Sequence, residues 1–124
     1  ALVATDLAFI FTTDYFWARV GLWLAGVGAL GGWVSGMVGL IDLTIVPGIR
    51  RLITAWCHAV LAVMLLSLAT FNWLLRLGAP DLHILPWGAC VSLLTALLIT
   101  ITSIFGGRLV YEHAVGVDTE EPPN

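Results

Sequence analysis

Three long runs of apolar residues dominate the chain, at residues 15–46, 50–77 and 85–111. Each run exceeds the roughly 20 residues that a helix needs to cross the hydrocarbon core of a bilayer. Turn-forming residues separate the runs, namely Val46-Pro47-Gly48 after the first, and Gly78-Ala79-Pro80-Asp81 with Pro86 after the second. The pattern therefore predicts three transmembrane helices.

A fourth apolar stretch, residues 1–13, has a helical pattern but would reach only about 20 Å at 1.5 Å per residue. That length is short of the hydrocarbon thickness. Because the chain also does not begin with Met, we expect this first helix to be truncated, with upstream residues missing. A re-entrant or interfacial start is the alternative, whereas a signal peptide is disfavoured because no basic region precedes the apolar run.

Composition supports a membrane protein, since 60% of the residues are hydrophobic, 10% are charged and the mean hydropathy is +1.00. The predicted fold class is all-α, a polytopic transmembrane bundle of four helical segments in contact with the lipid bilayer. Residues 1–117 form the predicted transmembrane domain, and residues 118–124 form an acidic, proline-containing tail. The five arginines form no basic run, which excludes a nucleic-acid partner.

The arginines predict an orientation in the membrane. Arg50, Arg51 and Arg108 lie on the same side as the C-terminus, whereas Arg19 and Arg76 lie on the other side. Positive charge concentrates on the cytoplasmic side of membrane proteins. We therefore expect a multi-pass protein of the bacterial inner membrane with a cytoplasmic C-terminus.

Glycines recur at four-residue spacing in the first long run, at Gly28, Gly32 and Gly36, with Gly21 and Gly39 near the same face. Small residues at this spacing allow the backbones of two membrane helices to approach closely. The predicted role of this ridge is helix packing within the bundle, and the alternative is a surface for a second copy or another subunit.

Polar residues follow one line of the second long run, at Arg51, Thr54, His58, Asn72 and Arg76. A second line, Ser92, Thr95, Thr102 and Gly106, follows the third run. We expect these two faces to meet inside the bundle because polar groups facing lipid cost several kcal/mol each. Two polar clusters result. One holds Asp42, Arg50, Arg51, His58, Arg108, Glu112 and His113, and the other holds Asp6, Arg19, Asn72 and Arg76, with Asp81 and His83 as further candidate members. The alternative for Arg19, Arg76 and Arg108 is snorkelling or structural pairing.

His58 is the first candidate for cofactor binding. It lies about 10 Å below the start of its helix, and Asp42 lies at comparable depth, so a carboxylate–imidazole pair is predicted. Such a pair would orient an imidazole that ligates haem b or hydrogen-bonds a quinone. A buried structural hydrogen bond is the alternative. His113 is a second candidate ligand, but it lies about 10 Å from His58 in depth, which disfavours the two as axial ligands of one haem.

Catalytic motifs such as HExxH, GxSxG and the phosphate-binding P-loop are not found in the sequence. We therefore expect this chain not to be an enzyme.

Several motifs resemble the bacterial membrane family called domain of unknown function 2231. They are Ser35-Gly36-Met37-Val38-Gly39-Leu40-Ile41-Asp42, Val46-Pro47, Arg50, Arg51, His58, Asn72-Trp73-Leu74-Leu75-Arg76 and the stretch from Gly106-Gly107-Arg108 to His113 and Val117. The resemblance covers nearly the whole chain and implies a four-helix inner-membrane protein. The family's first helix commonly opens with a His-Pro pair that is not found here, and Ala114 stands where a glycine is usual.

Some members of that family are fused to Rieske-type iron–sulfur domains, which implies a redox or quinone-linked setting. Our first functional prediction is a non-catalytic accessory subunit of a larger inner-membrane assembly, in electron transport. Its partners would be other membrane subunits or a second copy. The alternative is a small b-type cytochrome or quinone-binding protein that uses His58.

Overall fold

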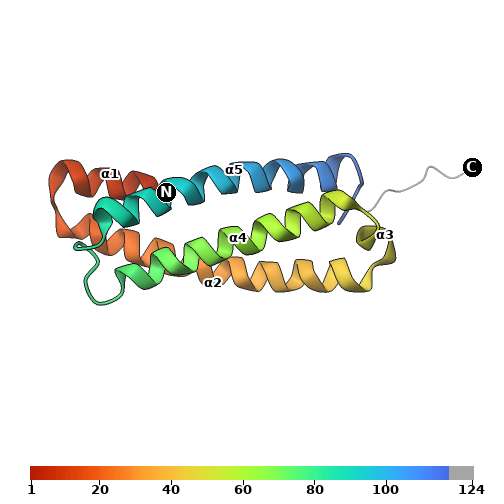
Figure 1. Cartoon of the computed structure of the whole chain (residues 1–124), viewed down its shortest axis with the longest axis horizontal. Coiled ribbons are helices and arrows are strands. Elements are labelled where there is room, and N and C mark those ends of the chain that lie inside the picture. Colours follow the sequence, from red (N-terminus) through yellow and green to blue (C-terminus); the bar gives the residue numbers. More distant parts are fainter. Residues whose placement is uncertain (118–124) are drawn as a thin grey trace, which may run out of the picture.

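The computed structural model describes residues 1–117, and every regular element among them is helical (Figure 1). The elements are α1 (Leu2–Thr12), α2 (Tyr15–Ile45), α3 (Pro47–Arg50), α4 (Ile53–Arg76), the π-helical segment η1 (Ile84–Gly88) and α5 (Ala89–Tyr111). The predicted all-α fold class is confirmed. The predicted tail at residues 118–124 lies outside the described residues.

The helix boundaries follow from local chemistry. The Asp14 side chain caps α2 by accepting a hydrogen bond of 2.9 Å from the backbone N–H of Phe16. α2 ends at Ile45, two residues before Pro47, which occupies the first turn of α3. After α4, Gly78 takes a φ of 86°, a left-handed conformation that favours glycine, and the chain turns back.

Three helical spans are long and apolar enough to cross a membrane, at Tyr15–Ile45, Ile53–Arg76 and Ile84–Tyr111, and α1 is shorter. This arrangement confirms the three predicted spans and the short first helix. One boundary and one bend differ from the prediction. The second span begins at Ile53 because α3 forms a separate turn, and the third span is bent at Leu85, whose φ of −109° and ψ of 134° are not helical.

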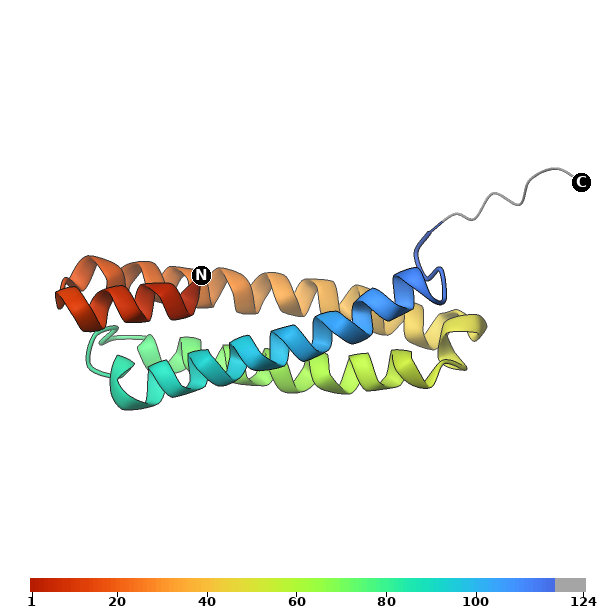
Figure 2. The same cartoon turned by 90° about the horizontal axis from the view of Figure 1, so that it is seen from above.

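α4 is the central helix, packed against both α2 and α5 (Figure 1). α1 lies beside the N-terminal half of α2 and also contacts α5, so it covers only the end of the bundle that holds Tyr15 (Figure 2). Large apolar side chains point outward along the spans, as at Trp23, which is 69% exposed. These outward side chains contact the lipid of the bilayer.

The glycines of α2 divide between packed and open positions. Gly32 and Gly36 face the Leu66 side chain of α4, whereas a Cβ at Gly28 would meet no atom within 4 Å. The predicted packing role therefore holds for Gly32 and Gly36 and is wrong for Gly28. The reason is geometric, because α2 meets α4 along a line that Gly28 does not face.

Candidate functional site

A buried ion pair joins α1 to α4. Both terminal nitrogens of Arg76 bind the Asp6 carboxylate, with Nη1 donating to Oδ1 at 2.7 Å and Nη2 to Oδ2 at 2.8 Å. The Arg76 side chain is fully buried, and Asp6 is 2% exposed. This bidentate geometry is the strong form of an arginine–carboxylate contact.

Two neutral residues complete the network. Arg76 Nε donates to Asn72 Oδ1 at 3.1 Å, and Asn72 Nδ2 donates to Ser92 Oγ of α5 at 2.9 Å. The Ser92 hydroxyl donates to Asp6 Oδ2 at 2.7 Å and accepts from Arg76 Nη2 at 3.1 Å. Three helices are thus joined by one closed set of hydrogen bonds.

Two glycines make room for the guanidinium. A Cβ at Gly21 of α2 would lie 2.8 Å from Arg76 Nη1, and a Cβ at Gly88 of η1 would lie 3.3 Å from Arg76 Nη2. Any larger residue at Gly21 would have to displace the charged group. Every side-chain nitrogen and oxygen of the network has a hydrogen-bond partner and the network is tightly enclosed, which is the arrangement expected of a structural staple.

The predicted polar cluster around Asp6 is therefore confirmed for Asp6, Asn72 and Arg76. Arg19 does not join it, since this side chain is exposed and forms no salt bridge within residues 1–117.

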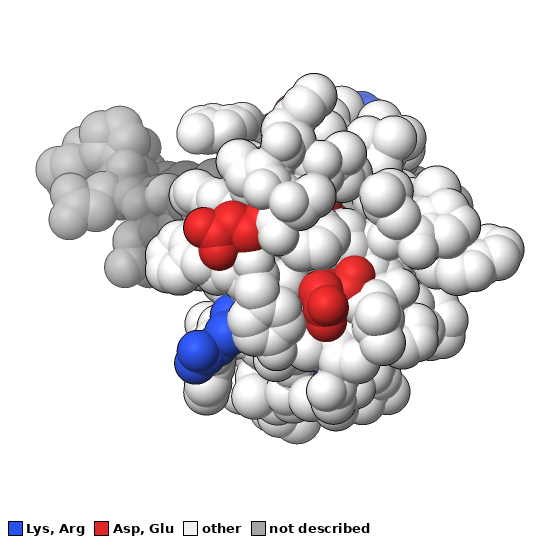
Figure 3. Space-filling model, turned by 90° about the vertical axis from the view of Figure 1, so that its left-hand side faces the viewer, with Lys and Arg blue, Asp and Glu red and all other residues white. Residues whose placement is uncertain are grey.

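The surface at the end of the molecule nearest the α1–α2 turn carries only a few charged side chains (Figure 3).

A second feature is an apolar groove of about 450 Å³ in the half of the bundle that α1 does not cover. Its lining comes mainly from α2 between Gly32 and Leu43 and from α4 between Ala55 and Leu66, with Leu109 and Val115 at one end. Eleven residue steps along each helix correspond to a groove roughly 16 Å long. The volume lies within the range of small-molecule sites, about 300–1,000 Å³.

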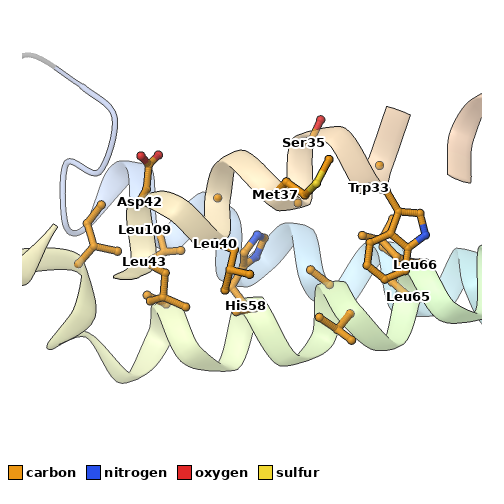
Figure 4. A pocket seen from close by; sticks show the side chains of 18 of the residues that line it. Trp33, Ser35, Met37, Leu40, Asp42, Leu43, His58, Leu65, Leu66 and Leu109 are labelled. Carbon is orange, nitrogen blue, oxygen red and sulfur yellow. The ribbon is translucent and has the colours of Figure 1, made fainter. Parts of the chain in front are cut away.

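His58 is the imidazole in this groove. The ring rises from α4, and Leu40 of α2 also lines the groove (Figure 4). Its Nδ1 lies 3.1 Å from the backbone carbonyl oxygen of Thr102 in α5. A Cβ at Gly106, one turn further along α5, would lie 3.1 Å from His58 Cε1, so the glycine leaves the space that the ring occupies.

The prediction for His58 was right in one respect and wrong in another. The side chain is half-buried and has a polar partner, but that partner is the Thr102 carbonyl and not Asp42. Asp42 lines the groove, yet it is exposed, and its carboxylate points away from the imidazole (Figure 4). Gly106 has no side chain, so the ring can lie against α5 and reach the Thr102 carbonyl, which explains the difference.

His113 does not join His58. It lies beyond the end of α5 at Tyr111, is exposed, and does not line the groove. This placement agrees with the expectation that His58 and His113 do not act as a pair, and His113 as a ligand by itself stays a prediction. Nearby, Arg108 Nε pairs with Glu112 at 3.0 Å within one helical turn on the exposed surface.

The polar lines of the second and third spans meet as predicted, through Asn72 with Ser92 and through His58 with Thr102. The roles of Gly88 and Gly106 were missed. Gly106 lies on the same helical line as Ser92 and Thr102, so its place opposite His58 had a detectable signal. Gly88 precedes α5 in an irregular segment, where helical periodicity gives no guide.

The family model described as "predicted membrane protein (DUF2231)" matches residues 1–119. The chain belongs to the DUF2231 family. The match covers the membrane spans and both features described above, and so confirms the resemblance drawn from the sequence motifs. No curated protein and no solved structure matches this DUF2231 chain.

Proposed function

We propose that this membrane protein is a non-catalytic ligand carrier of the bacterial inner membrane. It would hold an elongated lipophilic cofactor of the quinone class in the groove, with His58 at the cofactor's polar end. The observation that carries the proposal is the placement of a single imidazole, fixed by the Thr102 carbonyl, in a groove whose other surfaces are almost wholly apolar.

Shape supports a long ligand. His58 lies one turn from Ala55, at the end of the groove near α3, and the groove extends from it toward Leu66 in the middle of the bundle. A ligand with a polar head at His58 would therefore place its tail near the bilayer centre, where isoprenoid and acyl chains reside. Apolar lining with a few placed polar groups is the usual composition of small-molecule sites.

Haem b is the second candidate because an imidazole held at Nδ1 by a carbonyl is a common arrangement for axial ligation through Nε2. His113 lies outside the groove and cannot supply the opposite axial ligand there. The elongated form of the groove favours the quinone class.

The role as an accessory subunit in electron transport extends this proposal. A protein that holds a quinone without catalytic groups of its own would act beside a redox partner, which could be another membrane subunit or a second copy. The exposed side chains of α2, α4 and α5 would supply the contact surface.

The test is to purify the protein in mild detergent, record its visible spectrum, and analyse an organic extract for bound lipophiles. We expect a quinone-class molecule in near-stoichiometric amount and no Soret band. The variant His58→Phe should lose the molecule, whereas His113→Phe should retain it. A Soret band that shifts on reduction would replace the quinone assignment with haem, and an extract holding only phospholipid would contradict both.

A further inference from the structure

The hydrogen bond between His58 and Thr102 determines which nitrogen of the imidazole carries the proton. A backbone carbonyl oxygen can only accept, so Nδ1, at 3.1 Å from Thr102 O, must be the donor. In the neutral ring the other nitrogen, Nε2, is then a bare acceptor. Within residues 1–117 no hydrogen-bond partner reaches Nε2, although the side chain lines the groove.

A second polar group at the same level also lacks a partner. Thr102 is 7% exposed, and its hydroxyl is the buried side-chain oxygen without a hydrogen bond in the described part of the chain. The other threonines of the same helix, Thr95 and Thr100, donate to the carbonyl four residues earlier. Buried polar groups are normally satisfied, so the Thr102 hydroxyl, beside the carbonyl that accepts from His58, marks a place that could receive a polar atom, whereas His58 Nε2 is accessible rather than buried.

We infer that the groove selects ligands that donate a hydroxyl hydrogen bond to His58 Nε2. This inference rests on the proposed function and specifies the chemistry of its ligand. Within a quinone pair, only the reduced quinol form carries such hydroxyls, whereas the oxidised form offers carbonyl oxygens that face the bare Nε2 lone pair. The site therefore binds the reduced form, or another long-chain phenol, in preference to the oxidised form.

The preference for a hydroxyl follows from the free-energy cost of placing an acceptor against Nε2. A carbonyl oxygen placed against Nε2 leaves two acceptors facing each other in an apolar groove, and an unmatched polar group there is costly. A hydroxyl gains a hydrogen bond at the same place. One such difference corresponds to about tenfold or more in affinity.

A matched pair of redox-inert probes tests this selection. Para-decylphenol and its methyl ether have the same tail and ring, but only the phenol donates a hydrogen bond. Both would be titrated into the protein in lipid nanodiscs, with the fluorescence of Trp33, which lines the groove, compared in the wild type and in Trp33→Phe. We expect the phenol to bind about tenfold or more tightly than the ether.

The variant His58→Gln gives a sharper control because its amide can rotate to donate or to accept. This variant should still bind both probes, but the ratio of its affinities for the phenol and the ether should fall toward one. Nitrogen-15 spectra of histidine-labelled protein, assigned with His83→Gln and His113→Gln, should show His58 protonated at Nδ1 and bare at Nε2.

The outcomes separate the two proposals. If neither probe binds, the groove is not a ligand site, and both the proposed function and the inference fail. If both probes bind equally well to the wild type, or the ether binds more tightly, the site stands and the inference is overturned. A spectrum that shows a proton on Nε2 of His58 would also overturn it.

Discussion

Arg76 and His58 are polar residues on the same line of α4, but their nitrogens are used differently. Every nitrogen of the Arg76 guanidinium donates to a partner within the buried network. His58 has a partner at Nδ1 alone within the described residues. A group whose nitrogens all have partners holds the structure together, whereas a group with an accessible nitrogen that has no partner remains available for a ligand.

Replacing Arg76 should be severely destabilising. Arg76→Met leaves Asp6 as an uncompensated charge in a buried site, and loss of one partner of a buried pair costs about 3–5 kcal/mol. The free energy of unfolding would be measured by titrating the protein in mild detergent with sodium dodecyl sulfate. The control Arg19→Met removes an exposed arginine and should change that free energy by no more than about 0.5 kcal/mol.

The double variant Asp6→Leu with Arg76→Met removes both charges at once. Because no unpaired charge remains, it should be markedly more stable than Arg76→Met alone. Equal destabilisation by Arg76→Met and Arg19→Met would contradict the structural role given to the ion pair.

The space that Gly106 leaves for the His58 ring leads to a separate prediction at the residue scale. Gly106→Val should push the His58 ring away from α5, because a Cβ there already lies 3.1 Å from Cε1. We expect a loss of quinone affinity of about tenfold, corresponding to about 1.4 kcal/mol, because the displaced ring no longer holds the ligand's polar end. Gly107→Val is the matched control, since a Cβ at Gly107 meets no atom within 4 Å.

At the scale of the elements, the contact between α2 and α4 depends on two of the α2 glycines. Gly32→Leu should destabilise the bundle by about 1–3 kcal/mol because the new side chain would collide with Leu66. Gly28→Leu should be close to neutral because it points into open space. The free energy of unfolding of the two variants would be compared in the same detergent, and equal effects would show that this packing line is misplaced.

The elements themselves were largely predictable from the sequence. Length and hydropathy determine membrane spans, since the bilayer requires long apolar helices, and proline and glycine marked the breaks at Pro47 and Gly78. The partners of polar residues were only partly predictable. Helical periodicity identified which face of α4 turns inward, so the meeting of Asn72 with Ser92 followed from the pattern.

Rotation between helices was not predictable in the same way. Two relations depend on how α2 and α5 are rotated about their axes. Gly28 faces away from α4, and His58 hydrogen-bonds the Thr102 carbonyl instead of Asp42. A spacing of four residues places glycines on a similar face but does not say which neighbour that face meets. Those relations required the three-dimensional structure.

At the scale of the whole molecule, the burial of Arg76 sharpens the prediction of orientation. Its charge is paired inside the bundle, so Arg19 is the exposed arginine toward that end, against Arg50, Arg51 and Arg108 toward the other end. The positive-inside rule therefore predicts that the α3 end faces the cytoplasm. The groove would then place His58 in the cytoplasmic half of the membrane.

Cysteine labelling in intact cells tests this orientation. In a variant with Cys57 and Cys90 replaced by serine, Leu82→Cys should react with a membrane-impermeant maleimide, because the loop after α4 would face outward. His113→Cys should react only after the cells are opened. The reverse pattern would invert the topology without altering the fold.

The central claim is that the groove holds a lipophilic quinone-class ligand at His58. The most direct measurement is the affinity of a short-chain quinol for the protein in nanodiscs, compared between the wild type, Ala62→Phe and His113→Phe. Ala62 lines the groove away from the network of Arg76, so a phenylalanine there fills the space that the ligand would occupy. The account predicts that Ala62→Phe keeps its helical content yet binds about tenfold or more weakly, while His113→Phe binds like the wild type. Unchanged affinity in a folded Ala62→Phe variant would contradict the claim.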